Sequence, residues 1–215
     1  MFNFGKNNLK NTDTTLSLNE YIGIINMMSK NNDSTIAQIL NSKDEIISIT
    51  YVDHIEYCEE DNLIYLKRLI DNKYETVTAI IGEFASNIKY KVENQSDYST
   101  LVLNIPCNTA IKRDKNNKSI MDELSISNYI NKMNQLSKAH DVSVVRLFNR
   151  KGSTISITEI NELEYIENSK MIEFKKYINN SSETIGILNN FFIKDINYNS
   201  NLNKSQLNLT IDIVC

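Results

Sequence analysis

The stretch Pro106–Ser119 (PCNTAIKRDKNNKS) decides how the chain divides. It holds the single proline of the 215 residues, together with a dense run of charged and asparagine residues. Such a composition is typical of a loop or linker between folded segments. The sequence therefore predicts a flexible N-terminal arm over residues 1–15, a first α+β domain over residues 16–106, a linker over residues 107–118 and a second α+β domain over residues 119–215.

Both sides of this linker are predicted to follow one order: helix, strand, strand, helix, strand, strand. The closing strands echo one another, since residues 87–92 and 101–106 have counterparts in 192–198 and 207–213. Two successive αββαββ units predict two tandem ferredoxin-like sandwiches, each with an antiparallel sheet covered by helices on one face. An N-terminal β meander over residues 46–105 remains the alternative for the first half.

The first half begins with a helix, because Ser17 and Glu20 have the spacing of a capping box. A short second helix is expected after Asp33. Residues 46–52 (IISITYV) are β-branched and aromatic, which favours a strand. Residues 55–58 and 63–70 are expected to form a hairpin.

Residues 74–85 are ambiguous. Val77, Ile80, Ile81 and Phe84 have helical spacing, whereas the threonines among them favour a strand. We favour the helix.

In the second half, the apolar spacing over residues 120–139 predicts an amphipathic helix. Residues 142–148 and 154–160 read as strands. A further helix is expected over residues 165–189, with a break near Asn179. A C-terminal hairpin then closes the chain.

Parts of this second half match a known pattern: a helix at Asn128-Tyr-Ile running into Asp141-Val-Ser-Val-Val-Arg-Leu, and a later segment at Phe174-Lys-Lys-Tyr-Ile before the final strands. Residues 125–214 thereby resemble the ferredoxin-like module of pilus- and secretion-alignment proteins of the PilO and GspM type. The resemblance implies a non-catalytic protein that dimerises and holds partners in register. Members of that family also carry an N-terminal membrane helix, which has no counterpart here.

The amino-acid composition excludes several kinds of catalytic and nucleotide-binding site. The chain has 32 Asn and 31 Ile but only 5 Gly, a bias that follows A/T-rich codons. The glycines are isolated, so G-x-G-x-x-G and P-loop nucleotide sites are excluded. The sequence also contains no G-x-S-x-G, C-x-x-C or H-E-x-x-H motif. We therefore expect no catalytic, cofactor-binding or metal-binding residues, and no enzymatic activity.

Charge and cysteine content suggest the compartment. The formal net charge is −4 at pH 7, which makes nucleic acid an unlikely partner. Cys58, Cys107 and Cys215 are odd in number and widely spaced, so free thiols in a reducing compartment are expected. The most apolar early run, residues 21–28, is too short to span a membrane. A cytoplasmic location is predicted, or a virion if the chain is phage-encoded.

One group of residues could hold a metal ion. If residues 54–58 form a strand, His54, Glu56 and Cys58 lie on one face and could ligate a transition metal. The competing interpretation is a solvated acidic hairpin end. The five acidic residues between Asp53 and Asp61 could likewise form a contact patch or simply be solvated.

Three other features have both a functional and an ordinary interpretation. Lys112, Arg113, Lys115 and Lys118 could bind an anionic partner or be part of a solvated linker. His140 follows a predicted helix, where it either stabilises the helix end or acts as a general base. Tyr90 is a candidate base-stacking residue because Lys89 and Lys91 flank it. The other aromatic residues at alternate or helical spacing are expected in the core: Tyr65, Phe84, Phe148, Phe174, Phe191 and Phe192.

These features together favour a non-enzymatic structural or assembly component of a multi-subunit machine, such as a phage virion or tail or a pilus-type complex. It would act through contacts with other protein subunits, as a homo- or hetero-oligomer. The alternative is a regulatory module that binds a small ligand or a partner. An enzyme whose site is assembled from scattered residues is the third hypothesis.

Overall fold

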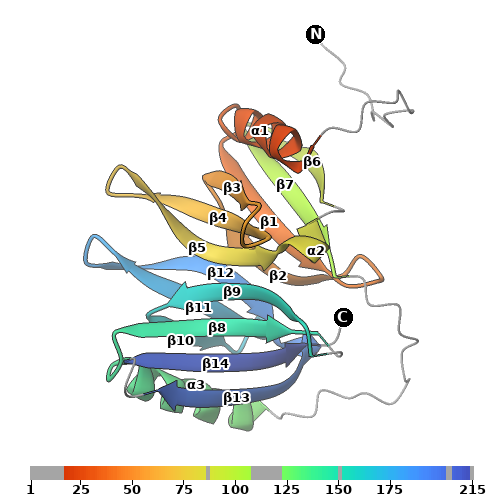
Figure 1. Cartoon of the computed structure of the whole chain (residues 1–215). Coiled ribbons are helices and arrows are strands. Elements are labelled where there is room, and N and C mark those ends of the chain that lie inside the picture. Colours follow the sequence, from red (N-terminus) through yellow and green to blue (C-terminus); the bar gives the residue numbers. More distant parts are fainter. Residues whose placement is uncertain (1–16, 86–87, 108–122, 150–151, 202–204, 214–215) are drawn as a thin grey trace.

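The computed structural model describes residues 17–85, 88–107, 123–149, 152–201 and 205–213. This part of the chain is built mainly from strands, which form two seven-stranded sheets around one hydrophobic core (Figure 1). The N-terminal half contains α1 (Leu18–Ser29), β1 (Ser34–Leu40), β2 (Ile46–Tyr51), β3 (His54–Cys58), β4 (Leu63–Ile70), β5 (Lys73–Ile81), α2 (Gly82–Ala85), β6 (Lys89–Gln95) and β7 (Tyr98–Pro106). The C-terminal half contains α3 (Glu123–Ser137), β8 (Val142–Phe148), β9 (Thr154–Ile160), β10 (Glu162–Ile166), β11 (Met171–Ile178), β12 (Ser181–Asn189), the 3-10 turn η1 (Asn190–Phe192), β13 (Ile193–Asn201) and β14 (Gln206–Ile213).

The two halves repeat one another at a nearly constant offset. β8 begins 108 residues after β1 (142 − 34), and the same offset relates β3 to β10, β4 to β11 and β5 to β12. When residues 17–82 are aligned with residues 125–190, 22 of the 66 positions carry the same residue. The repeated unit is therefore one helix followed by seven strands, with a short helical turn between the fifth and the sixth.

Each sheet is assembled from both halves. One sheet has the order β10-β11-β12-β2-β1-β7-β6 and the other has the order β13-β14-β8-β9-β5-β4-β3. Each half thus contributes four strands to one sheet and a three-stranded meander to the other. The two junctions are the antiparallel pairs β12–β2 and β5–β9. The two halves of the chain are therefore arranged like the two subunits of a domain-swapped dimer, in which each subunit adds strands to the other's sheet.

Small polar residues lie where the halves join. Ser48 and Thr50 in β2 are repeated as Ser156 and Thr158 in β9, and all four are buried. At the β5–β9 junction, the buried hydroxyl groups of Thr78 and Thr158 are hydrogen-bonded at 3.0 Å. Such hydrogen bonds offset the cost of burying polar groups.

The expected pair of tandem ferredoxin-like αββαββ sandwiches is wrong. Both sheets are mixed, because β1 pairs with β7 in parallel and β8 pairs with β14 in parallel. The meanders also cross from one half to the other half's sheet. The two sides of the linker do share one element order, as expected, but the repeated unit is one helix followed by seven strands and not αββαββ. Residues 108–122, which include most of the predicted linker, lie outside the described residues.

Three predicted helices are strands. The helix expected after Asp33 is β1, the one favoured over residues 74–85 is β5 followed by the short α2, and the one expected over residues 165–189 is β11 and β12. β1 is a strand because it pairs with β2 on one side and with β7 on the other. For the segments that form β5 and β12, the physical reason is a β-bulge in each strand. Val77 and Ile185 are the extra residues of these bulges, and both are buried.

A bulge places one more residue on the core face of its strand. The residues of β5 and β12 that belong to the hydrophobic core cluster are consequently three apart, at positions 77 and 80 and at positions 185 and 188. This spacing imitates that of a helix. The strand alternative for residues 74–85 agrees with the structure. Residues 46–105 are nearly all strand, as the alternative for the first half required, but they form no single meander, because β2, β6 and β7 lie in one sheet and β3, β4 and β5 in the other.

The other predicted elements are confirmed. Ser17 caps α1 with Glu20 in a capping box, and α3 begins and ends within the predicted range 120–139. α1 packs against β3 and α3 packs against β10, so the helices lie at opposite ends of the molecule (Figure 1). No helix in the described part of the chain has the length and hydropathy that a bilayer crossing requires.

Candidate functional site

The internal repeat separates contacts that the fold needs from contacts that only one half has. Asn26 in α1 donates from Nδ2 to Ile55 O at 2.7 Å, and Ile55 N donates to Asn26 Oδ1 at 2.8 Å. Asn134 in α3 makes the same pair of bonds with Leu163, at 2.7 and 2.9 Å. Each asparagine therefore takes the place of a neighbouring strand beside β3 or β10.

These asparagines matter because β3 and β10 are edge strands. An open edge presents unpaired backbone groups and can pair with another chain. A helix covers each of these two edges, and its asparagine satisfies the backbone groups of the central apolar residue. One edge of each sheet is thus closed by the protein itself.

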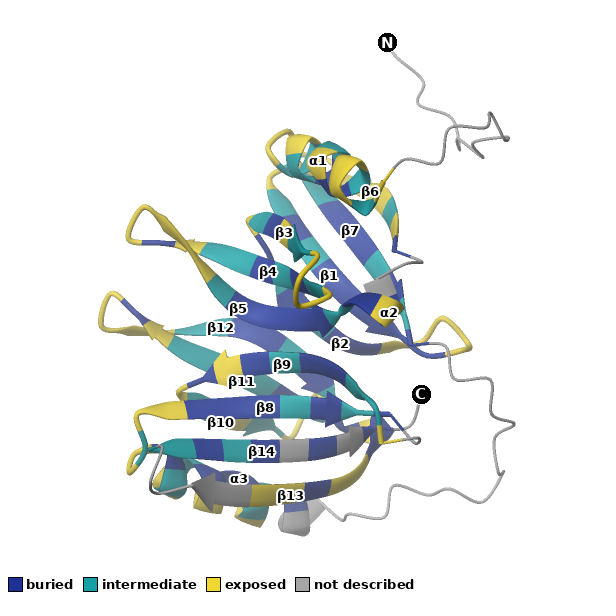
Figure 2. Cartoon of the chain, viewed as in Figure 1, coloured by how far each residue is buried: buried dark blue, intermediate teal, exposed yellow. Residues whose placement is uncertain are grey.

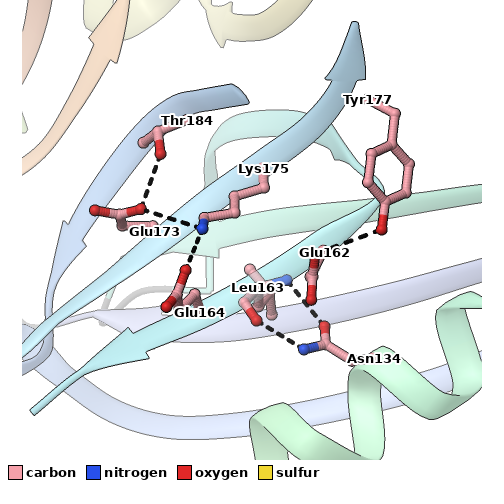
Figure 3. A network of polar contacts seen from close by, with 8 residues as sticks. All are labelled: Asn134, Glu162, Leu163, Glu164, Glu173, Lys175, Tyr177 and Thr184. Atoms are coloured by element: carbon pink, nitrogen blue, oxygen red, sulfur yellow. Dashed lines mark hydrogen bonds and ion pairs between the residues drawn. The ribbon is translucent and has the colours of Figure 1, made fainter. Parts of the chain in front are cut away.

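An ion pair on the outer strands is also present in both halves. Lys67 pairs with Glu56 in the N-terminal half. Lys175 pairs with Glu164 in the C-terminal half, and Figure 3 shows this second pair. The hydrogen bond with Glu164 raises the pKa of Lys175. The C-terminal half adds Glu173, whose carboxylate lies 3.7 Å from the Lys175 ammonium. Since this contact recurs with the fold, we interpret Glu56 as a structural residue.

The proposed metal ligands do not converge on one point. The His54 ring packs against Tyr74 with 4.8 Å between ring centroids, and Glu56 forms the ion pair just described. Cys58 Sγ lies 3.5 Å from Asp61 Oδ2. The described residues contain no group of three or more histidine, cysteine or acidic side chains arranged to hold a metal ion.

Two members of the acidic run from Asp53 to Asp61 stabilise the local hairpin. Asp53 accepts a hydrogen bond from Arg68 Nε at 2.9 Å and another from the backbone of Leu69 at 2.8 Å. Asp61 accepts from the Tyr65 hydroxyl at 3.1 Å. The interpretation of this run as a contact patch for a partner remains a prediction.

A polar pocket of about 200 Å³ lies between the end of α3 and the outer ends of β10 and β11. Its lining includes Ser137, His140, Asp141, Asn161, Glu162 and Tyr177. The Tyr177 hydroxyl lies 3.5 Å from Glu162 Oε2, as Figure 3 shows. Ser137 Oγ is bonded to Ser143 Oγ at 2.8 Å and to Asn161 O at 2.9 Å, so its hydroxyl is structural.

Three residues that line this pocket differ in type from their counterparts in the N-terminal half. The positions of His140, Glu162 and Tyr177 are occupied in the N-terminal half by Asn32, His54 and Leu69. His140 donates from Nδ1 to Leu136 O at 2.7 Å, in agreement with a role at the helix end. Sequence reasoning missed Glu162 and Tyr177, because it placed Tyr177 on a helix. Comparison of the two halves at the 108-residue offset is the signal that finds them.

The strand β6 is also distinctive, because it is the end strand of its sheet. Among the described helices, none closes its edge in the way that α1 closes β3 and α3 closes β10. Six of its seven residues are exposed (Figure 2). Tyr90 is the exception, since it packs against Tyr21 with 5.9 Å between ring centroids. Burial raises the pKa of Tyr21, whose hydroxyl donates to Ile88 O at 2.9 Å. Tyr90 is thus half-buried by α1 and does not offer a free stacking surface.

The remaining sequence candidates have mixed outcomes. Phe84, Phe174 and Phe192 are buried as expected, whereas Phe191 is 64% exposed. Cys58 is a free thiol, but Cys107 is disulfide-bonded, so the expectation of free thiols is wrong for Cys107. Cys215 and the basic residues Lys112, Arg113, Lys115 and Lys118 lie outside the described residues.

Comparisons with protein-family models, with curated proteins and with solved structures found no match to this chain.

Proposed function

We propose that this protein is a non-enzymatic assembly subunit that acts through contacts with other protein subunits. The observation that carries the proposal is the open edge at β6. Among the described strands, none pairs with β6 on the side away from β7. Both faces of its outer part, residues 91–95, are exposed. An open edge of this kind accepts an additional strand through backbone hydrogen bonds.

The contrast with the other edges supports this role. β3 and β10 are closed by α1 and α3 through Asn26 and Asn134. β13, the counterpart of β6, buries Ile193 and Ile196 and lies near α3, where Lys132 contacts the Tyr198 ring at 5.0 Å. β6 is the edge on which the fewest side chains are used for the protein's own core.

Insertion of proline tests this role. Proline lacks the backbone donor that strand pairing requires. The full-length tagged chain would be expressed in its native host together with an untagged copy, as wild type and as Val92→Pro. We expect the wild type to retain a stoichiometric protein partner that the variant loses. The absence of any stoichiometric partner from the wild type, or its retention by the variant, would contradict the proposal.

The location of this assembly role is also proposed. Disulfides persist in oxidising surroundings and are rare in the cytoplasm. The disulfide-bonded state of Cys107 therefore favours a virion over a cytoplasmic complex.

A ligand-binding regulatory role has one observation in its favour, the polar pocket beside α3. The carboxylates of Asp141 and Glu162 suit a small cationic ligand such as an amine or a guanidine. Binding would raise the thermal stability of the chain in a saturable way. A panel of small amines and guanidines that raises Tm for the wild type but not for Glu162→Gln would support this role. No change in Tm with any of them would remove it.

A further inference from the structure

The charge pattern of β6 identifies a partner for its open edge. Side chains alternate between the two faces of a strand, so Lys89, Lys91, Glu93 and Gln95 share one face. Lys91 and Glu93 are within 2.6 Å of each other, and each side chain is about half exposed, 53% and 51%. A positive and a negative charge thus stand two residues apart on an edge that no described strand covers.

We infer that β6 pairs antiparallel with β6 of a second copy of this chain, about a two-fold axis at Val92. This inference rests on the proposed assembly function and names its partner. In this register Lys91 lies opposite Glu93 of the second copy, and Glu93 lies opposite Lys91 of the second copy. Val92 faces Val92 of the second copy, and both are 40% exposed in the single chain.

The neighbouring registers are less favourable. A two-fold axis at residue 91 places Lys91 opposite Lys91 of the second copy, and an axis at residue 93 places Glu93 opposite Glu93 of the second copy. Like charges directly opposite each other destabilise a strand pair, whereas opposite charges stabilise it. An axis at residue 91 also brings Lys89 opposite Glu93 of the second copy, but it keeps the Lys91–Lys91 pair. The axis at Val92 is the one of these three that pairs opposite charges without a like-charge pair, so the edge is complementary to itself.

The second copy also fits the geometry of the closed edges. A two-fold contact uses the same surface on both subunits and stops at a dimer. Since the other end of this sheet, β10, is covered by α3, pairing through β6 would unite two seven-stranded sheets into one continuous sheet without further growth.

Exchange of the two charges tests this inference on the full-length chain. Sedimentation equilibrium should give a dimer of twice 24.8 kDa for the wild type. Lys91→Glu places a glutamate opposite Glu93 of the other copy at both symmetry-related positions and should raise the dimer Kd about tenfold or more. The double variant Lys91→Glu/Glu93→Lys restores opposite charges and should return the Kd to within about threefold of the wild-type value.

The control is Lys194→Glu, which makes the same change in charge on the exposed surface of β13 and should leave the dimer unchanged. A wild-type monomer at every concentration would overturn the inference, as would a double variant no better than the single one. The wild type could instead be a monomer that binds a different protein, and Val92→Pro could abolish that binding. This result would overturn the second copy as partner while leaving the proposed assembly function intact.

Discussion

A few side chains determine how the sheet edges are closed. Asn26 and Asn134 each make two hydrogen bonds to the backbone of an edge strand, 29 residues further along the chain. The capping box of α1 was predictable from Ser17 and Glu20, because its partners are three residues apart. The asparagine contacts were not, because the 108-residue offset shows that Asn26 and Asn134 correspond to each other but not which element each side chain reaches.

Replacement of either asparagine by alanine should destabilise the fold. Asn26→Ala and Asn134→Ala each leave a backbone N–H and a C=O without a partner, which we expect to cost about 1–3 kcal/mol of unfolding free energy. Urea unfolding measures this loss. Because the two sites are equivalent, the losses should be similar. A loss below about 0.5 kcal/mol at both sites would contradict the edge-closing role.

His54 should make stability depend on pH. Burial, and then the nearby positive charge of Lys67, holds its pKa below the ordinary value of 6.5. The folded chain therefore prefers neutral His54, and the stability this contributes is present above pH 6.5 and lost as the pH falls toward the folded-state pKa.

An NMR titration of the His54 ring, assigned with His54→Gln, should give a midpoint below 6.5. Tyr74→Ala removes the ring that covers His54 and should move the midpoint upward. A wild-type midpoint at or above 6.5 would show that His54 is not shielded in this way.

At the scale of elements, the bulges account for the main errors of sequence reasoning. The pattern of residues 55–70 predicted a hairpin correctly because its alternation is regular over the short β3 and the start of β4. In β5 and β12 the extra residues Val77 and Ile185 give the apolar side chains the three-residue spacing that is typical of a helix. Each of these segments is a strand because it pairs with a strand from the other half. Thr78 and Thr158, which are hydrogen-bonded across one such pair, are 80 residues apart in the chain. Local periodicity contains no information about that partner.

The tight turn between β11 and β12 can be improved. Asn179 and Asn180 have positive φ angles of 51° and 61°. Asparagine followed by glycine is a preferred pair in such a hairpin turn, since glycine adopts this backbone conformation without strain. We expect Asn180→Gly to stabilise the chain by up to about 1 kcal/mol and Asn180→Val to destabilise it by at least as much.

Thermal or urea unfolding of the two variants measures both effects. The matching change Asn72→Gly in the β4–β5 turn, where φ is 62°, should behave in the same way. Equal stability of the glycine and valine variants would contradict this conformation of the turn.

At the scale of the whole molecule, the division of the chain near residues 106–119 and the exchange of strands are separate properties. The composition of that stretch indicated two halves, and the constant offset of 108 residues could have been found by aligning the sequence with itself. Strand exchange could not have been found in this way. Two similar halves can each complete their own sheets, or they can exchange strands, and their sequences alone do not distinguish the two arrangements. The junction pairs β12–β2 and β5–β9 distinguish these arrangements.

Cleavage between the halves tests the shared fold most directly. A protease site would be inserted within residues 108–122 of the full chain, and the cleaved protein would be kept in reducing buffer because Cys107 is disulfide-bonded. Since each half completes the other's sheet, both fragments should elute together at the volume of the uncut chain and unfold in one transition. Separation into two folded fragments, each with its own unfolding transition, would contradict the account.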